Sequence, residues 1–376
     1  MAVIFTQDIA INTVLPAYNN NVIRFYSDTS SKTALTANIV INSKTIVLYP
    51  TQTGEFYFNF REYVTAIVNQ NRFIDLVNPD LDPLDNTTFV YAGTGFFSDN
   101  VLIKINFTDT TNESISRLLL FNMAVEQLDG YKRNVTQQGS DIVLSPLMPN
   151  TNNHYYVKYW EGYPFDLSFV TLSFPTANIV LNNLTNLLNY TFPAAGKITR
   201  LFFSDGSTDE SITDLLPIAL GENEIRFSDR YIIVDRQDVC EGLYIKWLNS
   251  YGGYSYWKFD NIFKRTTNTK SLGEVVTDFE NLGQTFSQVA ELGKIAGEKI
   301  AVNTDTLDEN ELTLLKSLLI SPKAYLFVGE PFSRADITDW VEVKITSQNY
   351  TTRNYKGQPV KLAFELELPD LYTQVL

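Results

Sequence analysis

Apolar and polar residues alternate in many short runs along this chain, and a period of two is typical of β-strands. The most aromatic run, residues 243–259, reads LYIKWLNSYGGYSYWKF. Two alternating segments joined by an Asn/Gly-rich stretch predict a β-hairpin, because Gly252 and Gly253 can take the positive φ of a tight turn. We expect this hairpin to form the core and edge of a β-sandwich.

Residues 1–128 predict a first β-sandwich with one packed helix. The helix follows Asn59, which can serve as its N-cap. Glu62, three residues further on, can complete a capping box. Its apolar residues form one stripe at helical spacing, namely Phe60, Tyr63, Val64, Ile67 and Val68. Strand patterns of this unit occur at residues 22–26, 38–48, 101–107 and 115–125.

Residues 141–264 predict a second unit that is nearly all β. Turn signals such as Asp205-Gly206 separate at least seven short strand patterns, which is typical of an immunoglobulin-like or fibronectin-like sandwich. The polar, glycine-bearing stretch 129–140 is the expected boundary with the first unit. A single cysteine in the chain excludes the disulfide of an antibody-type domain.

Residues 271–376 predict a third unit, a small α+β domain. The polar stretch 265–270, RTTNTK, is expected to be the linker that precedes it. Thr306 or Asp308 can cap a helix that ends before Pro322. Strand patterns follow at residues 324–328, 340–345 and 362–368. The whole chain is therefore predicted to be mainly β, with tandem β-sandwich modules and a C-terminal α+β domain.

Composition narrows the classes of partner. The formal net charge of the 376 residues is −14, and no cluster of Lys and Arg interrupts it. Binding to nucleic-acid phosphates needs a basic face, so we expect no direct contact with nucleic acid. The start, MAVIFTQDIAINTV, lacks the features of a secretory signal, and no apolar run is long enough to span a bilayer. We expect synthesis in a cytoplasm and no membrane span.

The chain carries no recognisable catalytic motif. His154 is the only histidine and Cys240 the only cysteine, which excludes metal sites built on His/Cys clusters. No nucleophile elbow accompanies His154, and Cys240 lies beside acidic residues that raise a thiol pKa. The acidic turn after Asp205 does not match a calcium loop, because Gly206 follows directly. We expect no catalytic residue, no metal and no cofactor, and hence no enzyme.

The aromatic residues of the 243–259 run allow two interpretations. Tyr251, Tyr254, Tyr256 and Trp257 could form a platform on which a sugar stacks. Aromatics that alternate along a strand are more often sheet packing. Trp247 is expected to be structural, and Trp257 to a lesser extent. The sequence leaves open whether these five side chains are an interaction surface or part of the core.

Three local patterns carry a resemblance to known proteins. The hairpin YIKWLNSYGGYSYWKF resembles the W-L-N-x-x-G-G-aromatic hairpin in virion proteins of tailed phages of Bacteroidetes hosts. Residues 309–328, ENELTLLKSLLISPKAYLFV, resemble their helix that ends in a Leu-Leu-x-Ser-Pro strand. Residues 341–345 followed by 361–368 are similar to their closing strand pair. These motifs are short and structural. They indicate how strands and a helix pack, and they do not indicate an activity.

The resemblance implies a structural protein of the tail, neck or baseplate. It would form a homo-oligomeric, symmetric ring and contact neighbouring tail proteins, because rings close through head-to-tail contacts. Its location would be the virion, after synthesis in the cytoplasm of the host bacterium. The alternative is a carbohydrate- or receptor-binding module of the tail tip that uses exposed aromatics.

Overall fold

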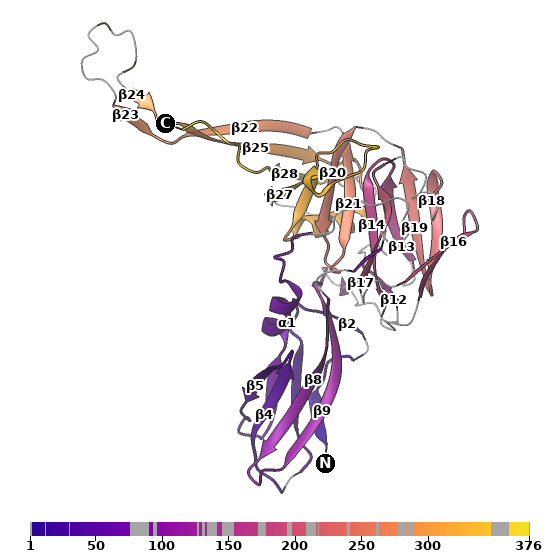
Figure 1. The fold of residues 1–376 in the computed structure, drawn as a ribbon, viewed down its shortest axis with the longest axis vertical. Helices are drawn as coiled ribbons and strands as arrows, with labels where there is room; N and C mark the ends of the chain where they lie inside the picture. Colours follow the sequence, from indigo (N-terminus) through magenta and orange to yellow (C-terminus); the bar gives the residue numbers. More distant parts are fainter. Residues whose placement is uncertain are drawn as a thin grey trace.

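The fold is known from a computed structural model (Figure 1). The structure describes residues 2–11, 13–29, 31–75, 90–92, 96–125, 128–129, 132–133, 141–144, 154–171, 178–193, 198–207, 216, 218–238, 241–260, 263–276, 283, 287, 289–346 and 361–375. These residues form mainly β-strands with two α-helices, which confirms the predicted mainly-β class. The strands make several separate sheets.

The N-terminal part is a sandwich of two sheets (the lower part of Figure 1). One sheet has the order β1-β3-β6 and the other β2-β9-β8-β4-β5. Alternating apolar residues of both sheets fill a single core that includes Phe25, Phe56 and Ile103. The strands are β1 (Val3–Gln7), β2 (Val14–Pro16), β3 (Val22–Ser27), β4 (Ala34–Ile41), β5 (Lys44–Leu48), β6 (Phe56–Asn59), β8 (Phe96–Phe107) and β9 (Asn112–Asn122).

Helix α1 (Arg61–Val68) covers this core, as its apolar stripe predicts. Val64 and Val68 are buried, and Phe60 at the N-cap position is fully buried. Asn59 Oδ1 accepts a hydrogen bond from Arg61 N at 3.1 Å, although the N-cap residue is Phe60 and not Asn59 as expected. The stripe of apolar residues therefore located the helix correctly, while its first residue was misplaced by one.

Two more sheets form the middle of the molecule. Their orders are β12-β14-β17-β7 and β13-β19-β18-β15-β16. Strand β7 (Val90–Ala92) comes from the predicted first unit but pairs with β17, so this sheet crosses the expected boundary. The other strands are β12 (Asp141–Val143), β13 (His154–Trp160), β14 (Pro164–Thr171), β15 (Asn178–Asn183), β16 (Leu188–Pro193), β17 (Ile198–Asp205), β18 (Gly221–Phe227) and β19 (Arg230–Gln237). A two-residue pair, β10 (Leu128–Asp129) and β11 (Lys132–Arg133), lies in the predicted boundary.

The aromatic run folds into the predicted hairpin, β20 (Gly242–Leu248) and β21 (Tyr254–Asp260). Its place differs from the prediction. It pairs with β26 and joins a seven-stranded sheet of order β21-β20-β26-β27-β28-β25-β22, so it belongs with the C-terminal strands. The remaining strands are β22 (Phe263–Ser271), β25 (Lys294–Asn303), β26 (Ala324–Phe327), β27 (Trp340–Thr346) and β28 (Ala363–Glu367), with the 3-10 helix η2 (Ile337–Asp339) before β27.

The expected linker 265–270 is wrong. These residues lie within β22, which pairs with β25 along its full length. Both strands extend from the body as an arm that continues into β23 (Glu274–Val276) and β24 (Val289–Glu291), at the upper left of Figure 1. Every residue of β22 is exposed, so the strand has no buried face. Because no face needs apolar side chains, its sequence lacks the alternation by which strands are recognised.

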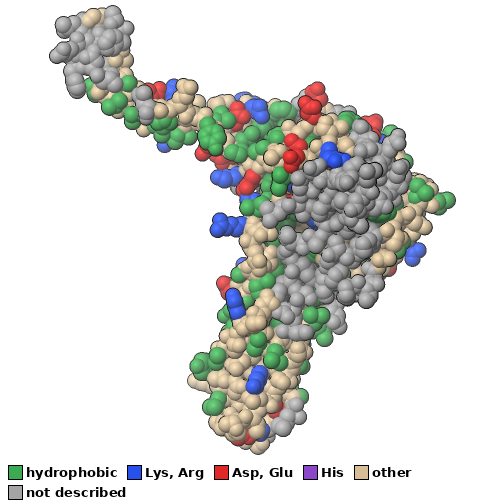
Figure 2. All heavy atoms as spheres, in the orientation of Figure 1, with side chains coloured by type: hydrophobic (Ala, Val, Ile, Leu, Met, Phe, Trp, Pro, Cys, Tyr) green, Lys and Arg blue, Asp and Glu red, His purple; other side chains and the backbone are tan. Residues whose placement is uncertain are grey.

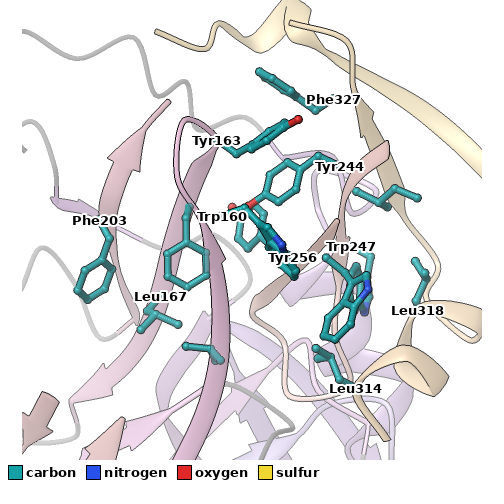
Figure 3. Packing of buried hydrophobic residues seen from close by; sticks show 14 of the residues in the cluster. Trp160, Tyr163, Leu167, Phe203, Tyr244, Trp247, Tyr256, Leu314, Leu318 and Phe327 are labelled. Atoms are coloured by element: carbon teal, nitrogen blue, oxygen red, sulfur yellow. The ribbon is translucent and has the colours of Figure 1, made fainter. Parts of the chain in front are cut away.

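Helix α3 (Glu309–Leu319) packs on the seven-stranded sheet, and its leucines face the hairpin (Figure 3). Asp308, one of the two residues predicted to cap this helix, is its N-cap, and Glu311 completes the capping box. Leu314 and Leu318 belong to a cluster that also holds Trp160, Phe169 and Ile232 of the middle sheets. The middle and C-terminal parts therefore share one continuous hydrophobic core, in contrast to the separate units expected.

Candidate functional site

The five aromatic residues singled out in the sequence lie in or against the core. Trp247 is 0% exposed, and its Nε1 donates a hydrogen bond to Ser317 Oγ at 2.9 Å. Figure 3 shows it next to Leu314 and Leu318. Tyr256 and Trp257 are buried, whereas Tyr251 and Tyr254 are half-buried. These rings therefore do not form an exposed platform for a sugar.

The sequence did not point to the most unusual feature nearby, a buried group of four charged side chains. Arg200, on β17, donates two hydrogen bonds to Asp166 of β14, from Nε at 2.9 Å and from Nη2 at 2.6 Å. Its Nη1 donates to Asp75 Oδ1 at 2.7 Å. The contact with Asp166 is bidentate, and a third hydrogen bond goes to Asp75. The planar guanidinium has donors in the fixed geometry that this arrangement needs. One arginine thus links two carboxylates.

Lys246 of β20 completes the group. Its Nζ lies 2.9 Å from Asp75 Oδ2 and 4.2 Å from the centre of the Trp340 ring. The rings of Tyr325 and Tyr254 lie at 5.2 and 5.8 Å. Aromatic faces stabilise a cation that has lost its water, which is how a lysine can be accommodated in this core. The two cations and two carboxylates balance in charge.

We call Asp75, Asp166, Arg200 and Lys246 the ionic junction, because they come from three parts of the chain. Asp75 follows α1 in the N-terminal part, and its backbone N donates to Tyr325 Oη at 3.0 Å. Asp166 and Arg200 belong to a middle sheet, and Lys246 belongs to the C-terminal sheet. All four side chains are buried. Breaking one partner of such a group is costly, since it leaves an uncompensated charge in the interior.

The environment shifts the pKa of both ends of the lysine–carboxylate contact. Burial raises the pKa of Asp75, but the charges of Arg200 and Lys246 outweigh burial and hold this pKa well below its usual range. Burial also lowers the pKa of Lys246, and the attraction of Asp75 only partly opposes this. Asp75 is therefore ionised at neutral pH, and Lys246 is the cation of the junction whose pKa is lowered, whereas that of Arg200 is raised.

Tyrosines surround the junction and remain neutral to high pH. Tyr256 donates its hydroxyl hydrogen to Asp166 Oδ1, and burial followed by the charge of Asp166 raises its pKa. Burial likewise raises the pKa of Tyr254, whose ring lies 4.5 Å from the Arg200 guanidinium. For Tyr325 burial is the main cause of a pKa of about 12. These groups act as neutral hydrogen-bonding and packing partners, not as acids.

The turn of the hairpin provides a second contact between parts of the chain. Asn122 Nδ2 donates to Tyr251 O at 2.7 Å, and Val125 N donates to Ser250 O at 2.8 Å. A Cβ atom on Gly253 would lie 2.6 Å from Leu144 O, so a larger residue cannot approach this closely. The sequence predicted glycine here for the turn alone, but the structure adds the contact with the neighbouring segments.

A cleft at the side of the C-terminal sheet has a volume of about 210 Å³. Trp160 and Trp257 form its apolar part, with ring centres 5.4 Å apart. Lys158 and Glu311 form an ion pair in its lining, and Lys158 Nζ lies 5.2 Å from the Trp257 ring centre. Pockets for drug-sized ligands usually have volumes of about 300–1,000 Å³. This cleft therefore suits only a small polar group.

His154, Cys240, metal ligands and membrane spans were the other features considered from the sequence. The ring of His154 stacks on Tyr231 with centres 4.9 Å apart, in strand β13. Cys240 lies outside the described residues. Within the described ranges no group of three His, Cys, Asp or Glu side chains is placed to hold a metal ion. No described helix is long and apolar enough to cross a membrane.

Comparison with known proteins gives only structural likenesses. No family model matches the sequence, and no curated protein matches it. Fibronectin(III)-like modules of Clostridium thermocellum CbhA match 63% of this chain and 94% of theirs, with 7% identity and a TM-score of 0.20. The teleost fish polymeric Ig receptor ectodomain matches 64% of this chain and 100% of its own, with 7% identity and a TM-score of 0.21. Likenesses of this degree carry no inference about function.

Proposed function

We propose that this protein is a structural component of a tailed-phage virion. It forms a symmetric ring in the tail, neck or baseplate and contacts neighbouring tail proteins. The observation that carries the proposal is the ionic junction together with the arm. The junction connects three parts of the chain into one body, and the arm extends from that body with its outer strand, β22, fully exposed. A body that holds an extended strand pair in a fixed direction suits a subunit that bridges to neighbours.

Several further observations support assembly over catalysis. The buried charges are satisfied by one another, as expected of a structural group. Strands β5, β16 and β22 are edge strands, which provide places where another chain can pair. Three sequence motifs resemble those of phage virion proteins, and this resemblance is the reason for proposing a virion as the assembly. No catalytic role is proposed for any residue.

The test is to count copies in purified particles of the phage that encodes the chain. Quantitative mass spectrometry gives the ratio to other virion proteins, and electron microscopy gives the symmetry. We expect several copies in a fixed ratio, arranged about one axis. Absence from the particles, or one or two copies with no symmetric contacts, would refute the proposal.

A second candidate function is binding of a small sugar or receptor group in the cleft beside Trp160 and Trp257. The observation that favours it is a cleft lined by two tryptophans and by charged side chains such as Lys158 and Glu311. Titration with monosaccharides, followed by tryptophan fluorescence, tests it. Saturable quenching that disappears in Trp257→Leu but persists in Trp340→Phe would favour this function, and no quenching would exclude it.

A further inference from the structure

The cleft beside Trp160 and Trp257 is lined by more acidic than basic side chains. On the face of the molecule drawn in Figure 2, acidic and basic side chains are interspersed, so the charge of the cleft has to be taken from its own lining. The lining contains four carboxylates and two ammonium groups, those of Asp238, Asp260, Asp305, Glu311, Lys158 and Lys258. The excess of negative charge is the opposite of what a site for phosphate or carboxylate groups needs.

The two lysines of the lining already have acidic partners. Lys158 forms an ion pair with Glu311. Lys258 Nζ lies 3.1 Å from Asp260 Oδ1, and the Lys258 side chain is 0% exposed. Each positive charge is therefore matched by one carboxylate of the same cleft. The two lysines do not give the cleft a preference for an anion.

Asp238 and Asp305 are the two carboxylates that remain. Asp238 directly follows β19, and Asp305 lies between β25 and α3, and both residues are exposed. Within the part of the chain that the structure describes, neither forms an ion pair. Asp238 acts electrostatically on Arg236, but Arg236 forms its own ion pair with Glu161. The lining therefore presents two negative charges that no lysine or arginine of the cleft matches.

The start of α3 borders the same cleft and does not reverse this preference. The first turn of a helix favours negative charge, because its backbone N–H groups have no partner within the helix. Here Asp308 Oδ1 accepts a hydrogen bond from Glu311 N at 2.7 Å, and Glu311 Oε2 accepts one from Asp308 N at 2.9 Å. Two carboxylates thus already occupy this end of the helix, and a further anion is not required there.

The tryptophans of the lining suit an ammonium group as well. Lys158 Nζ lies 5.2 Å from the centre of the Trp257 ring, so this ring already contacts one cation of the chain. Tryptophan is the aromatic side chain that attracts cations most strongly. Within the described ranges no group of three acidic, histidine or cysteine side chains is placed to hold a metal ion. The cation that fits this lining is therefore organic.

We propose that the cleft binds the ammonium group of a small ligand and, where that ligand is a sugar, an amino sugar. Asp238 and Asp305 hold the ammonium group, and the apolar face of the sugar ring lies against the tryptophans. This inference rests on the second candidate function, binding of a small sugar in the cleft, and names the class of sugar. It is independent of a role in a virion ring.

The test compares ligands that differ in charge and share one ring. Glucosamine, N-acetylglucosamine, glucose and glucuronic acid are titrated into the full chain at a slightly acidic pH, where the glucosamine amine is protonated. Ethylammonium, which carries the cation without a sugar, is titrated in parallel. Tryptophan fluorescence and calorimetry give the affinities. We expect glucosamine to bind about tenfold more tightly than the two uncharged sugars, and more weakly as salt is added, because salt screens exposed charges.

A double variant shows which side chains recognise the cation. In Asp238→Asn with Asp305→Asn, the affinity for glucosamine should fall about tenfold, to that of glucose. The matched control is Glu224→Gln with Asp370→Asn, which removes the same charge at exposed positions outside the cleft. The control should keep the preference for glucosamine. Denaturant unfolding establishes that both variants are as stable as the unmodified protein.

The outcomes separate failure of this inference from failure of the candidate function. Equal binding of glucosamine and glucose, or tighter binding of glucuronic acid, would overturn the inference and leave sugar binding in place. A preference for glucosamine that survives in the double variant would overturn the role of Asp238 and Asp305. Binding of ethylammonium without binding of any sugar would exclude the sugar and retain the cation site. Absence of binding by all five ligands would refute both.

Discussion

Strands β20 and β22 belong to the same seven-stranded sheet but have opposite surroundings. Five of the seven residues of β20 are buried, including Lys246, and neighbours cover both of its faces. All nine residues of β22 are exposed, including Lys264 and Lys270. One strand is the centre of the body and the other is the edge of the arm.

The comparison teaches that the same residue type is stabilised in different ways within one sheet. The Lys246 ammonium lies among Asp75 and three aromatic rings, where it has exchanged water for fixed partners. The lysines of β22 keep their hydration and add solubility to a strand edge. Substitutions in the body should therefore change stability, and substitutions in the arm should change association.

The largest effect is expected for Arg200→Ala. The change leaves Asp75 and Asp166 buried without their shared guanidinium, so we expect a loss of about 5 kcal/mol in the free energy of unfolding. Denaturant unfolding followed by tryptophan fluorescence measures this loss for the middle and C-terminal parts of the chain. All four tryptophans, at positions 160, 247, 257 and 340, lie in the continuous core of the middle and C-terminal parts.

Arg265→Ala on the arm is the control for this prediction. Its side chain is 57% exposed and its ion pair with Glu298 is weak, so its loss should cost at most about 0.5 kcal/mol. Similar losses for the two arginines would remove the distinction between the body and the arm. A loss below about 1 kcal/mol for Arg200→Ala would mean that the ionic junction does not hold the body together.

The second effect in size is expected for Trp247→Ala. This side chain is fully buried between the sheet and α3, and truncation leaves a large cavity and removes the hydrogen bond that Ser317 Oγ accepts. We expect a loss of about 4 kcal/mol, measured by the same unfolding experiment. Trp247→Phe keeps most of the volume and should cost less. A loss below about 1 kcal/mol for the alanine variant would contradict the placement of Trp247 in the core.

The third prediction concerns acid. The pKa of Asp75 in the folded protein is below its ordinary value of 3.8, so the unfolded chain binds this proton first. Its contribution to stability is complete above pH 3.8 and is lost as pH falls through the folded pKa. We expect the free energy of unfolding to decrease below about pH 4. In Asp75→Asn this part of the pH dependence should vanish, and an unchanged profile would contradict the assignment.

The smallest effect is expected for Lys270→Ala on β22. Its side chain is exposed, so the free energy of unfolding should change by less than about 0.5 kcal/mol. Lys246→Ala is the matched substitution in β20, and it should cost several times more because Asp75 loses a buried partner. Equal effects at the two lysines would show that the two strands do not differ as described.

The sequence predicted the parts of the fold that depend on local pattern. The hairpin of β20 and β21, the stripe of α1 and the Asp308 cap of α3 follow from residues close together in the chain. The ionic junction was not predicted, because its contacts join residues 125 and 171 positions apart, Asp75 with Arg200 and Asp75 with Lys246. A lone charged residue in a strand pattern gives no sign of such a partner.

The error at β22 has a physical reason as well. A strand that is exposed on both faces has no apolar side to alternate with a polar one, so RTTNTK reads as a linker. Its threonines favour an extended backbone and were the available signal. The opposite case is β20, where burial on both faces hides which side meets the core. Period-two patterns identify strands that have one buried face and miss these extremes.

The most direct test of the whole account is an electron-microscopy reconstruction of the assembled protein in phage particles. The account predicts copies related by rotation about one axis, with the arm of each copy contacting a neighbouring protein and the body of each copy unchanged at the ionic junction. A reconstruction without this protein, or with its copies unrelated by symmetry, would contradict the account. A symmetric ring whose arms contact nothing would retain the structural function and refute the arm as its link.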